Sequence, residues 1–276
     1  MNGTTATAAL SVANLDRSFG GLRATSDVSF DVAEGTITAL IGPNGAGKTT
    51  LFNLITNIIR PNAGKVLFHG HNITGVTPAR IAAMGLVRTF QTARVFPGMT
   101  VLENVLVGRH RLLHAGTLAQ MLWLPHTRRE ERNLAAQAEA LLDAVGLASY
   151  RDTHAVDLPM GAQKLLEVIR ALMAKPRLLL LDEPAAGLND SETEELAALL
   201  RAIRETGITV LVVEHNMSLV MNVADQVVVL EAGAVIARGR PDEVQRNPRV
   251  IEAYLGSDAT TQDFDAQDSD AEEARP

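Results

Sequence analysis

The sequence predicts an α/β fold with a mainly parallel sheet, an antiparallel β-subdomain at the N-terminus and a helical subdomain inserted in the core. Three observations support this prediction. Strand-like segments at 10–18, 26–33 and 64–70 suggest a small antiparallel sheet. Apolar strands that are each followed by a helix come next, which is typical of a parallel sheet covered on both faces. Between them, residues 94–172 contain few β-branched runs.

Four apolar segments are expected to form the parallel strands, and we expect the fourth to close the set. They are TITALIG (36–42), RLLLLDE (177–183), ITVLVVEH (208–215) and QVVVLEAG (226–233). Helices are expected after the first three, at 48–59, 191–205 and 216–224. The helical subdomain is placed at about 92–175. Within it, residues 129–146 carry apolar side chains at helical spacing and end at Gly146.

Composition limits the remaining options. The chain has 46% hydrophobic residues, no cysteine and a formal charge of −7. Residues 257–276 contain seven acidic side chains and one arginine, a net charge of −6, so the rest of the chain is near −1 and has no bulk basic charge for nucleic acid. We expect a flexible N-terminus at 1–9, an acidic disordered tail at 257–276 and one folded domain at 10–256. The N-terminus lacks the pattern of a secretory signal, and no segment reaches the roughly 18 apolar residues of a membrane span.

A glycine-rich segment, GPNGAGKT (42–49), fits the pattern G-x-x-x-x-G-K-[ST] between an apolar strand and a helix with an apolar face. Its backbone amides and the helix N-terminus would bind phosphate oxygens. Lys48 would add a positive charge, and the Thr49 hydroxyl would be a ligand for Mg²⁺. The core is therefore expected to be of the P-loop NTPase type; a structural glycine turn is the alternative. The residues expected to bind the nucleotide phosphates here are Gly42, Pro43, Asn44, Gly45, Ala46, Gly47, Lys48, Thr49 and Thr50.

Two carboxylates end the strand LLLLDE. Asp182 is expected to hold Mg²⁺, and Glu183 to orient or deprotonate the attacking water. An acidic pair that caps the next helix is the alternative interpretation.

Three further side chains complete the predicted nucleotide site. His215, at another strand end, would reach the γ-phosphate or the water. Gln91 would sense Mg²⁺ and transmit its state to the helical insertion, and Phe19 would stack on adenine. The alternatives are a structural histidine, a surface loop glutamine and a core phenylalanine of the small sheet.

The order of these parts resembles an ABC-type ATPase over about residues 10–256. Within that family, four segments are similar to one ATPase subunit of the branched-chain amino-acid importers. They are VRTFQTARVFPGMTVLENV (87–105), DEPAAGLND (182–190), VVEHNMSLVM (212–221) and NPRVIEAYLG (247–256). Asn189, where many ABC ATPases have Asp, fits that subtype.

The resemblance implies ATP hydrolysis with Mg²⁺, in which Glu183, His215 and Lys48 are catalytic and Thr49, Gln91 and Asp182 hold the metal. It also implies a second ATPase subunit, two membrane-spanning subunits and an extracytoplasmic solute-binding protein, with this chain peripheral on the cytoplasmic face of the membrane. Import of branched-chain or related amino acids is the expected function. Import of urea, amides or another small solute is the alternative, followed by a non-transport ABC ATPase, a GTPase or a kinase.

The segment LPMGAQ (158–163) occupies the position of the family signature L-S-G-G-Q. By the resemblance, Pro159, Met160, Gly161 and Gln163 would face ATP held by the partner subunit. Pro159 has neither a hydroxyl nor an N–H, although proline is tolerated at a helix's first position. We expect this chain to pair with a different ATPase subunit and to weaken its partner's site; the alternative is that Pro159 has little effect. Apolar residues at 111–130, with Trp123 and nearby Phe96, are either the packed face of the insertion or a groove for the membrane subunit.

Overall fold

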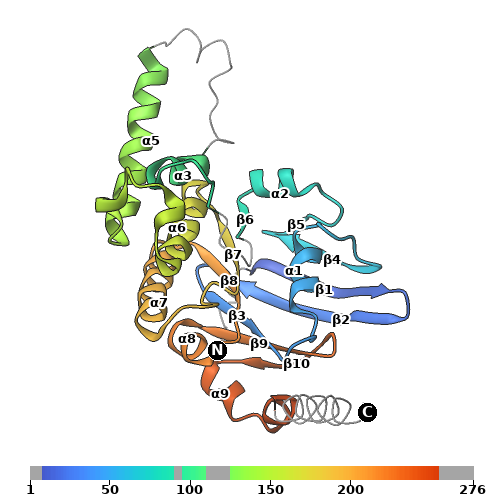
Figure 1. Ribbon diagram of the computed structural model, residues 1–276. Helices are drawn as coiled ribbons and strands as arrows, with labels where there is room; N and C mark the ends of the chain where they lie inside the picture. The colour runs from blue at the N-terminus through green and yellow to red at the C-terminus, as the bar shows by residue number, and fades with distance from the viewer. Residues whose placement is uncertain (1–7, 90–94, 110–124, 255–276) are drawn as a thin grey trace, which may run out of the picture. The chain divides into compact units, whose positions relative to one another are not determined.

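The computed structural model describes residues 8–89, 95–109 and 125–254 (Figure 1). Within this range the chain divides into two compact units. The first contains residues up to 33, 37–75 and from 213 onward; the second contains 34–36 and 76–212. The described part of the predicted helical segment at 92–175 therefore belongs to the second unit, together with part of the core.

The N-terminal strands form an antiparallel sheet with strand order β2-β1-β4-β5 (Figure 1). Its strands are β1 (Ala8–Phe19), β2 (Leu22–Ala33), β4 (Ala63–Phe68) and β5 (His71–Asn72). Buried and exposed residues alternate along much of β2, as expected for a sheet with one covered face. The predicted antiparallel sheet is confirmed. β1 begins at Ala8, inside the segment expected to be flexible, because Ala8 and Leu10 pair with β2.

Six strands form a second sheet with the order β10-β9-β3-β8-β7-β6. They are β3 (Ile37–Ile41), β6 (Leu86–Arg88), β7 (Leu178–Asp182), β8 (Thr209–Val213), β9 (Gln226–Glu231) and β10 (Ala234–Gly239). Every residue of β3, β7 and β8 is buried, as a strand covered on both faces requires. The pairs β3–β9 and β6–β7 are parallel.

The parallel strands end with β9, as predicted, but the sheet has one further strand, β10, at its edge, which the sequence analysis did not find. β10 follows β9 through a tight turn and pairs with it antiparallel. Ala232 and Gly233 make this turn with positive φ angles of 44° and 81°. The residues of β10 are partly exposed rather than buried, as suits a strand at the edge of the sheet.

Helices follow the strands as expected. Those of the first unit are α1 (Lys48–Ile55), α8 (Met217–Val223) and α9 (Pro241–Gln245). Those of the second unit are α2 (Pro78–Ala83), α3 (Val101–Val107), α5 (Pro125–Ala144), α6 (Met160–Met173) and α7 (Asp190–Glu205), with 3₁₀ turns at Ala148–Tyr150 and Ala155–Asp157. α5 ends close to the predicted Gly146, which has a φ of 71°.

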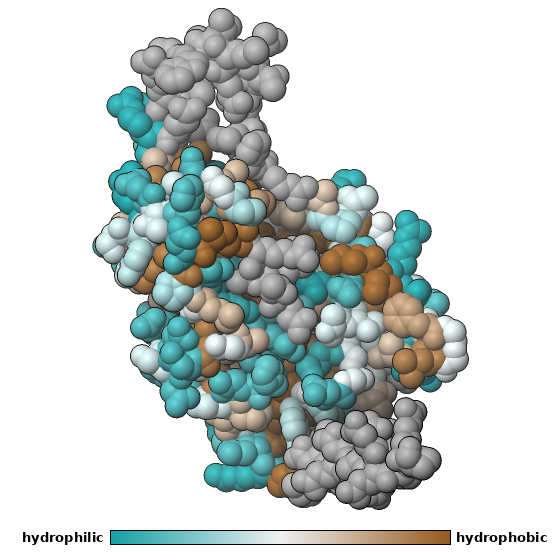
Figure 2. Space-filling view, in the orientation of Figure 1, coloured by the Kyte–Doolittle hydropathy of each residue, from teal (hydrophilic) through white to brown (hydrophobic). Residues whose placement is uncertain are grey.

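Among the described residues, none of the helices combines the length and the apolar composition that crossing a membrane requires. On the face drawn in Figure 2, hydrophilic residues are interspersed with smaller hydrophobic areas. Large apolar side chains that are exposed in the first unit include Phe19, Leu22 and Ile58, and those of the second include Phe96, Met160 and Val156.

Candidate functional site

The glycine-rich segment forms a loop between β3 and α1, in the first unit. Lys48 is the first residue of α1, and its Nζ donates to the carbonyl oxygens of Gly42, at 2.6 Å, and Pro43, at 3.0 Å. The Lys48 side chain is therefore enclosed by its own loop and is only 8% exposed, whereas Thr49 is exposed. Ala46 closes the turn by donating its N–H to the Pro43 carbonyl. The loop thus places an ammonium group and a helix N-terminus next to one another, which is an arrangement suited to phosphate.

Neighbouring backbone fixes the shape of this loop. The Gly233 N–H donates to the Ala46 carbonyl at 3.0 Å, and the Ser26 N–H donates to the Gly233 carbonyl at 2.8 Å. A Cβ atom on Gly42, whose φ is 153°, would collide with the carbonyl oxygen of Leu230. The turn between β9 and β10 therefore packs directly against the phosphate loop, and glycine is required at the loop's first position.

Gly47 is constrained in a similar way on the other side of the loop. Its φ is 100°, and a Cβ atom there would collide with the Ala24 carbonyl oxygen of β2. Gly47 is also the N-cap of α1, where no side chain caps the helix. The first amides of α1 therefore have no side-chain acceptor at the cap, which suits them to bind an anion.

Tyr254, near the C-terminal end of the described chain, is a residue that the sequence analysis did not single out. Its hydroxyl oxygen is buried. Burial raises the pKa of the Tyr254 phenol, and a hydrogen-bonding interaction with the Gly42 backbone partly offsets that rise. The C-terminal helical turn therefore reaches the start of the phosphate loop.

His215 follows β8 and is exposed. The preceding residue, Glu214, is fully buried, and its carboxylate accepts the backbone N–H groups of His215, at 3.1 Å, and Asn216, at 3.2 Å. The Glu214 N–H donates to the Leu40 carbonyl, which places His215 beside the end of β3, from which the phosphate loop begins. Glu214 was also missed by the sequence analysis, because a carboxylate inside an apolar strand end gives no periodic signal.

Phe19 lies at the end of β1 and is 43% exposed, so it is not a core residue of the small sheet. The guanidinium of Arg17 lies over its ring, 4.7 Å from the centroid, and Arg17 also donates to the Arg60 carbonyl. The stacking of Phe19 on adenine stays a prediction, and Arg17 already lies over this exposed ring.

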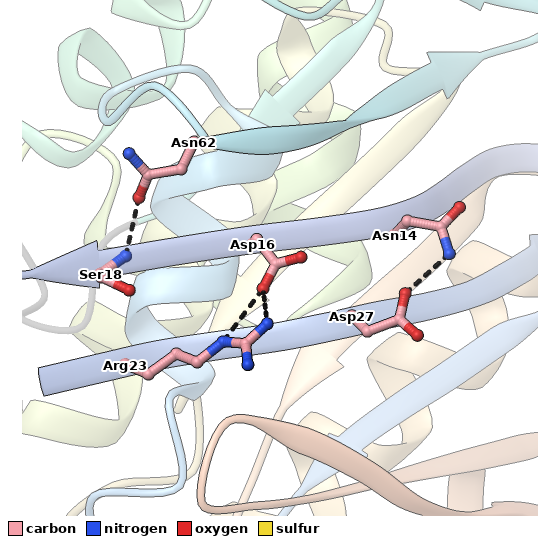
Figure 3. A network of polar contacts seen from close by, with 6 residues as sticks. All are labelled: Asn14, Asp16, Ser18, Arg23, Asp27 and Asn62. Carbon is pink, nitrogen blue, oxygen red and sulfur yellow. Dashed lines mark hydrogen bonds and ion pairs between the residues drawn. The ribbon is translucent and has the colours of Figure 1, made fainter.

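Polar contacts order the hairpin that carries Phe19 (Figure 3). Arg23 binds Asp16 across the two strands and lowers the pKa of that carboxyl, and Asn14 donates to Asp27 at 2.7 Å. The Ser18 N–H donates to the Asn62 side chain at 2.8 Å, which ties β1 to the segment before β4. The hairpin is therefore defined by specific contacts close to its turn.

The acidic pair ends β7 in the second unit. Asp182 is 3% exposed, and its Oδ2 lies 2.8 Å from Nη2 of Arg88, at the end of β6. Glu183 adopts a left-handed conformation with a φ of 49°, and its carbonyl accepts the Ala186 N–H at 3.1 Å. Glu183 therefore does not continue the strand but begins the turn that leads to α7. The predicted alternative, in which this pair caps the helix, does not apply, because Asn189 and Glu192 form the capping box of α7.

The signature segment starts α6. Pro159 is the N-cap, one residue before the first helical residue, and no side chain caps this helix. Met160 is 60% exposed, whereas Gly161 is buried against α7, where a Cβ atom would collide with the Glu192 carboxyl group. The Gln163 side chain donates to the Leu158 carbonyl at 2.9 Å, so it braces the loop before α6.

Two predicted features lie outside the described residues: Gln91, and the segment 111–124 with Trp123. Phe96 is described and lies beneath Arg170 of α6, whose guanidinium is 5.2 Å from the ring centroid. Among the described residues, no group of three or more histidine, cysteine or acidic side chains could hold a metal ion by itself.

Comparison with known proteins gives a consistent result. Residues 25–186 match the family described as ABC transporter, and residues 234–260 match a family described as branched-chain amino acid ATP-binding cassette transporter. The chain is 45% identical to the high-affinity branched-chain amino acid transport ATP-binding protein BraF of Pseudomonas aeruginosa, over 90% of this chain and 97% of that protein. It is 42% identical to LivG of Escherichia coli, a protein with the same description, with the same coverage of both chains.

Solved structures agree with these relatives. A nucleotide-free ATP-binding cassette from an ABC transporter superposes with a TM-score of 0.78 and 34% identity, covering 90% of this chain and 98% of that one. The ADP conformation of an ABC transporter cassette gives the same score and identity. The predicted P-loop NTPase fold is thereby confirmed, and the chain belongs to the ABC transporter family of ATP-binding proteins.

Proposed function

We propose that this chain is the ATP-hydrolysing subunit of an importer for branched-chain or related amino acids. The observation that carries the proposal is the 45% identity to a branched-chain amino acid transport ATP-binding protein over 97% of that protein. The match of residues 234–260 to a family named for the same transporters supports it independently of the nucleotide motifs. As a member of the ABC family the chain is an ATPase, and the amino-acid substrate is the part that remains to be tested.

The first unit supplies the phosphate cradle. Backbone amides of residues 45–49 and the N-terminus of α1 bind the phosphate oxygens, and Lys48 leaves its carbonyl partners to neutralise charge on the β- and γ-phosphates. Such preorganised donors stabilise charge that develops in the transition state. His215, held by the buried Glu214, contacts the γ-phosphate or the attacking water, and Phe19 stacks on the adenine ring.

The second unit supplies the carboxylates. Glu183 orients the attacking water and accepts its proton. Mg²⁺ prefers oxygen ligands, and those available here are the Thr49 hydroxyl, Gln91 and the Asp182 carboxylate. The described residues contain no cluster of three potential metal ligands, which fits a metal bound largely by nucleotide phosphates and water. When bound, Mg²⁺ would neutralise charge on the phosphate oxygens.

The assembly follows from the function. An importer needs membrane-spanning subunits, so we place this chain on the cytoplasmic face of the membrane as a peripheral subunit, with a solute-binding protein on the other side. The signature residues Pro159, Met160 and Gly161 would face ATP bound by a second ATPase subunit. Because Pro159 removes a phosphate donor from this surface, a partner chain of different sequence is favoured over a second copy.

The decisive experiment is transport in proteoliposomes by the complex of this chain with its permease subunits and solute-binding protein. Uptake of radiolabelled leucine, isoleucine or valine that depends on internal ATP is expected, and urea or short amides should not compete. Lys48→Ala should abolish both uptake and ATP hydrolysis, whereas Lys65→Ala, at an exposed lysine of β4, should leave them unchanged. ATP-dependent uptake of urea instead of leucine would replace the proposed substrate and leave the ATPase assignment intact.

A further inference from the structure

The ion pair between Arg88 and Asp182 joins the ends of two adjacent parallel strands. Arg88 ends β6 and pairs in register with Leu180 of β7, and the next residue, Thr89, donates its N–H to the Leu180 carbonyl at 2.9 Å. Nη2 of Arg88 lies 2.8 Å from Oδ2 of Asp182. The strand pairing therefore fixes the position of the guanidinium relative to the carboxylate.

Burial distinguishes this ion pair from the surface pairs of the molecule. The side chains of Arg88 and Asp182 are 9% and 4% exposed. An ion pair of the same 2.8 Å length, Arg201 with Glu194 on α7, has side chains that are 32% and 62% exposed. A carboxylate taken out of water requires a compensating charge, so the state of Asp182 depends on which cation lies next to it.

Arg88 supplies that charge in the absence of nucleotide. The guanidinium is always protonated, so the pair has no net charge and offers little attraction to a bare divalent cation. No cluster of three or more potential ligands exists among the described residues to compensate. A cation that arrives with a nucleotide brings phosphate oxygens as additional ligands, which is the usual way in which proteins hold Mg²⁺.

We propose that Arg88 is a positioning residue that holds Asp182 as its counterion in the nucleotide-free protein and so makes uptake of Mg²⁺ at Asp182 dependent on nucleotide. This inference rests on the proposed role of Asp182 as a metal ligand. It assigns to Arg88 an effect on metal affinity in the absence of nucleotide, which a purely structural ion pair would not have. The consequence is that free Mg²⁺ does not occupy the site before ATP.

The test measures Mn²⁺ binding to the full chain by electron paramagnetic resonance, where the free-ion signal reports unbound metal. Wild-type protein should bind little Mn²⁺ without nucleotide. Arg88→Gln removes the competing charge, and nucleotide-independent Mn²⁺ affinity should rise by at least roughly tenfold. Arg201→Gln, which breaks the exposed ion pair of equal length with Glu194, should leave Mn²⁺ affinity unchanged.

A second variant covers the loss of stability that Arg88→Gln is expected to cause. Arg88→Lys keeps the positive charge but loses the planar fork, so it should fold and show a smaller gain in Mn²⁺ affinity. In Arg88→Gln protein, added Mn²⁺ should raise the melting temperature more than it does in wild type. Wild-type Mn²⁺ affinity in a folded Arg88→Gln protein would overturn the inference. If Arg88→Gln does not fold, wild-type Mn²⁺ affinity in a folded Arg88→Lys protein would overturn it.

Asp182→Asn separates the two proposals. If Asp182 is a metal ligand, this change weakens Mn²⁺ binding in the presence of ATP, and it abolishes the gain when combined with Arg88→Gln. Unchanged Mn²⁺ binding with ATP in Asp182→Asn would refute the metal role of Asp182 in the proposed function. Weakened binding in that variant, together with no gain in Arg88→Gln, refutes only the role assigned to Arg88.

Discussion

The carbonyl oxygen of Leu230, at the end of β9, lies where a side chain on Gly42 would have to stand. The turn after Leu230 is tied to the same loop by the hydrogen bond from Gly233 to Ala46. The strand that ends the parallel part of the sheet therefore shapes the phosphate loop, although the two are far apart in sequence. A change that weakens the packing of Leu230 against Gly42 should consequently also weaken nucleotide binding.

The variant Gly42→Ala tests this coupling. Residues with a side chain rarely adopt the backbone conformation of Gly42, and the added methyl would collide with the Leu230 carbonyl. Each effect should lower the free energy of unfolding by about 1–3 kcal/mol. The melting temperature should fall, and the stabilisation by added ATP should largely disappear. Thermal unfolding with and without ATP measures both effects.

Gly45→Ala is the matched control for Gly42→Ala. Gly45 has a φ of 77° but no atom within 4 Å of its would-be Cβ, so it has the backbone strain without the collision. Its loss of stability should be about 1–2 kcal/mol, as expected for the left-handed conformation alone. Equal losses in the two variants would show that the contact with Leu230 does not constrain the loop.

Titration of Tyr254 provides a second prediction. The chain has two tyrosines, so the variant Tyr150→Phe leaves Tyr254 as the only one. Because burial raises the pKa of Tyr254 from 10.0, its absorbance change near 295 nm should occur at higher pH than that of a free tyrosine. The folded protein then holds the proton more tightly than the unfolded chain, so this contribution to stability is complete below pH 10.0 and is lost as the pH rises through the folded pKa.

Tyr254→Phe examines what the hydroxyl does for the loop. It removes a buried hydroxyl whose pKa is influenced by the Gly42 backbone, so if this hydroxyl helps to shape the loop, ATP affinity should fall by a few-fold. Tyr150→Phe, at a 44% exposed tyrosine, is the control and should bind ATP as wild type does. Wild-type ATP affinity in Tyr254→Phe would limit the C-terminal turn to a packing role.

The residues found from sequence and those missed differ in one physical respect. The phosphate loop and the pair Asp182–Glu183 are short local patterns of residue types suited to binding phosphate and metal, and the strands around them are continuous apolar runs. Arg88 is 94 residues from Asp182 in the chain, and only strand pairing brings the two together. Glu214 was missed for a related reason, since a single buried charge at a strand end gives no periodic pattern.

The close packing of Gly161 against Glu192 gives a third prediction. Gly161→Ala should displace the Glu192 carboxyl group and break the capping box with Asn189, which costs about 1 kcal/mol. Glu192→Ala costs a similar amount but leaves room for the added methyl. The double variant should therefore lose less stability than the sum of the two single variants, which chemical denaturation can measure as a coupling energy. Strict additivity would show that Glu192 relaxes away without cost.

Pro159 is the subject of the last prediction. The N-cap of α6 has no side-chain hydrogen bond, and serine at this position would supply one, raising stability by about 0.5–2 kcal/mol. The serine hydroxyl could also donate a hydrogen bond to phosphate bound by the partner subunit. Such a bond stabilises the transition state by roughly 1.5–3 kcal/mol, so ATP turnover at the partner's site should rise by about 10–100-fold. ATPase activity of the assembled complex measures this effect.

Two controls separate capping from catalysis in Pro159→Ser. Pro78→Ser exchanges the same residue types at the start of α2, at an exposed position, and should leave ATPase activity unchanged. The isolated Pro159→Ser chain should gain stability without its partner, because capping is local. A more stable chain whose complex hydrolyses ATP no faster would mean that Pro159 affects only the helix, and the argument for an impaired site in a heterodimer would then fail.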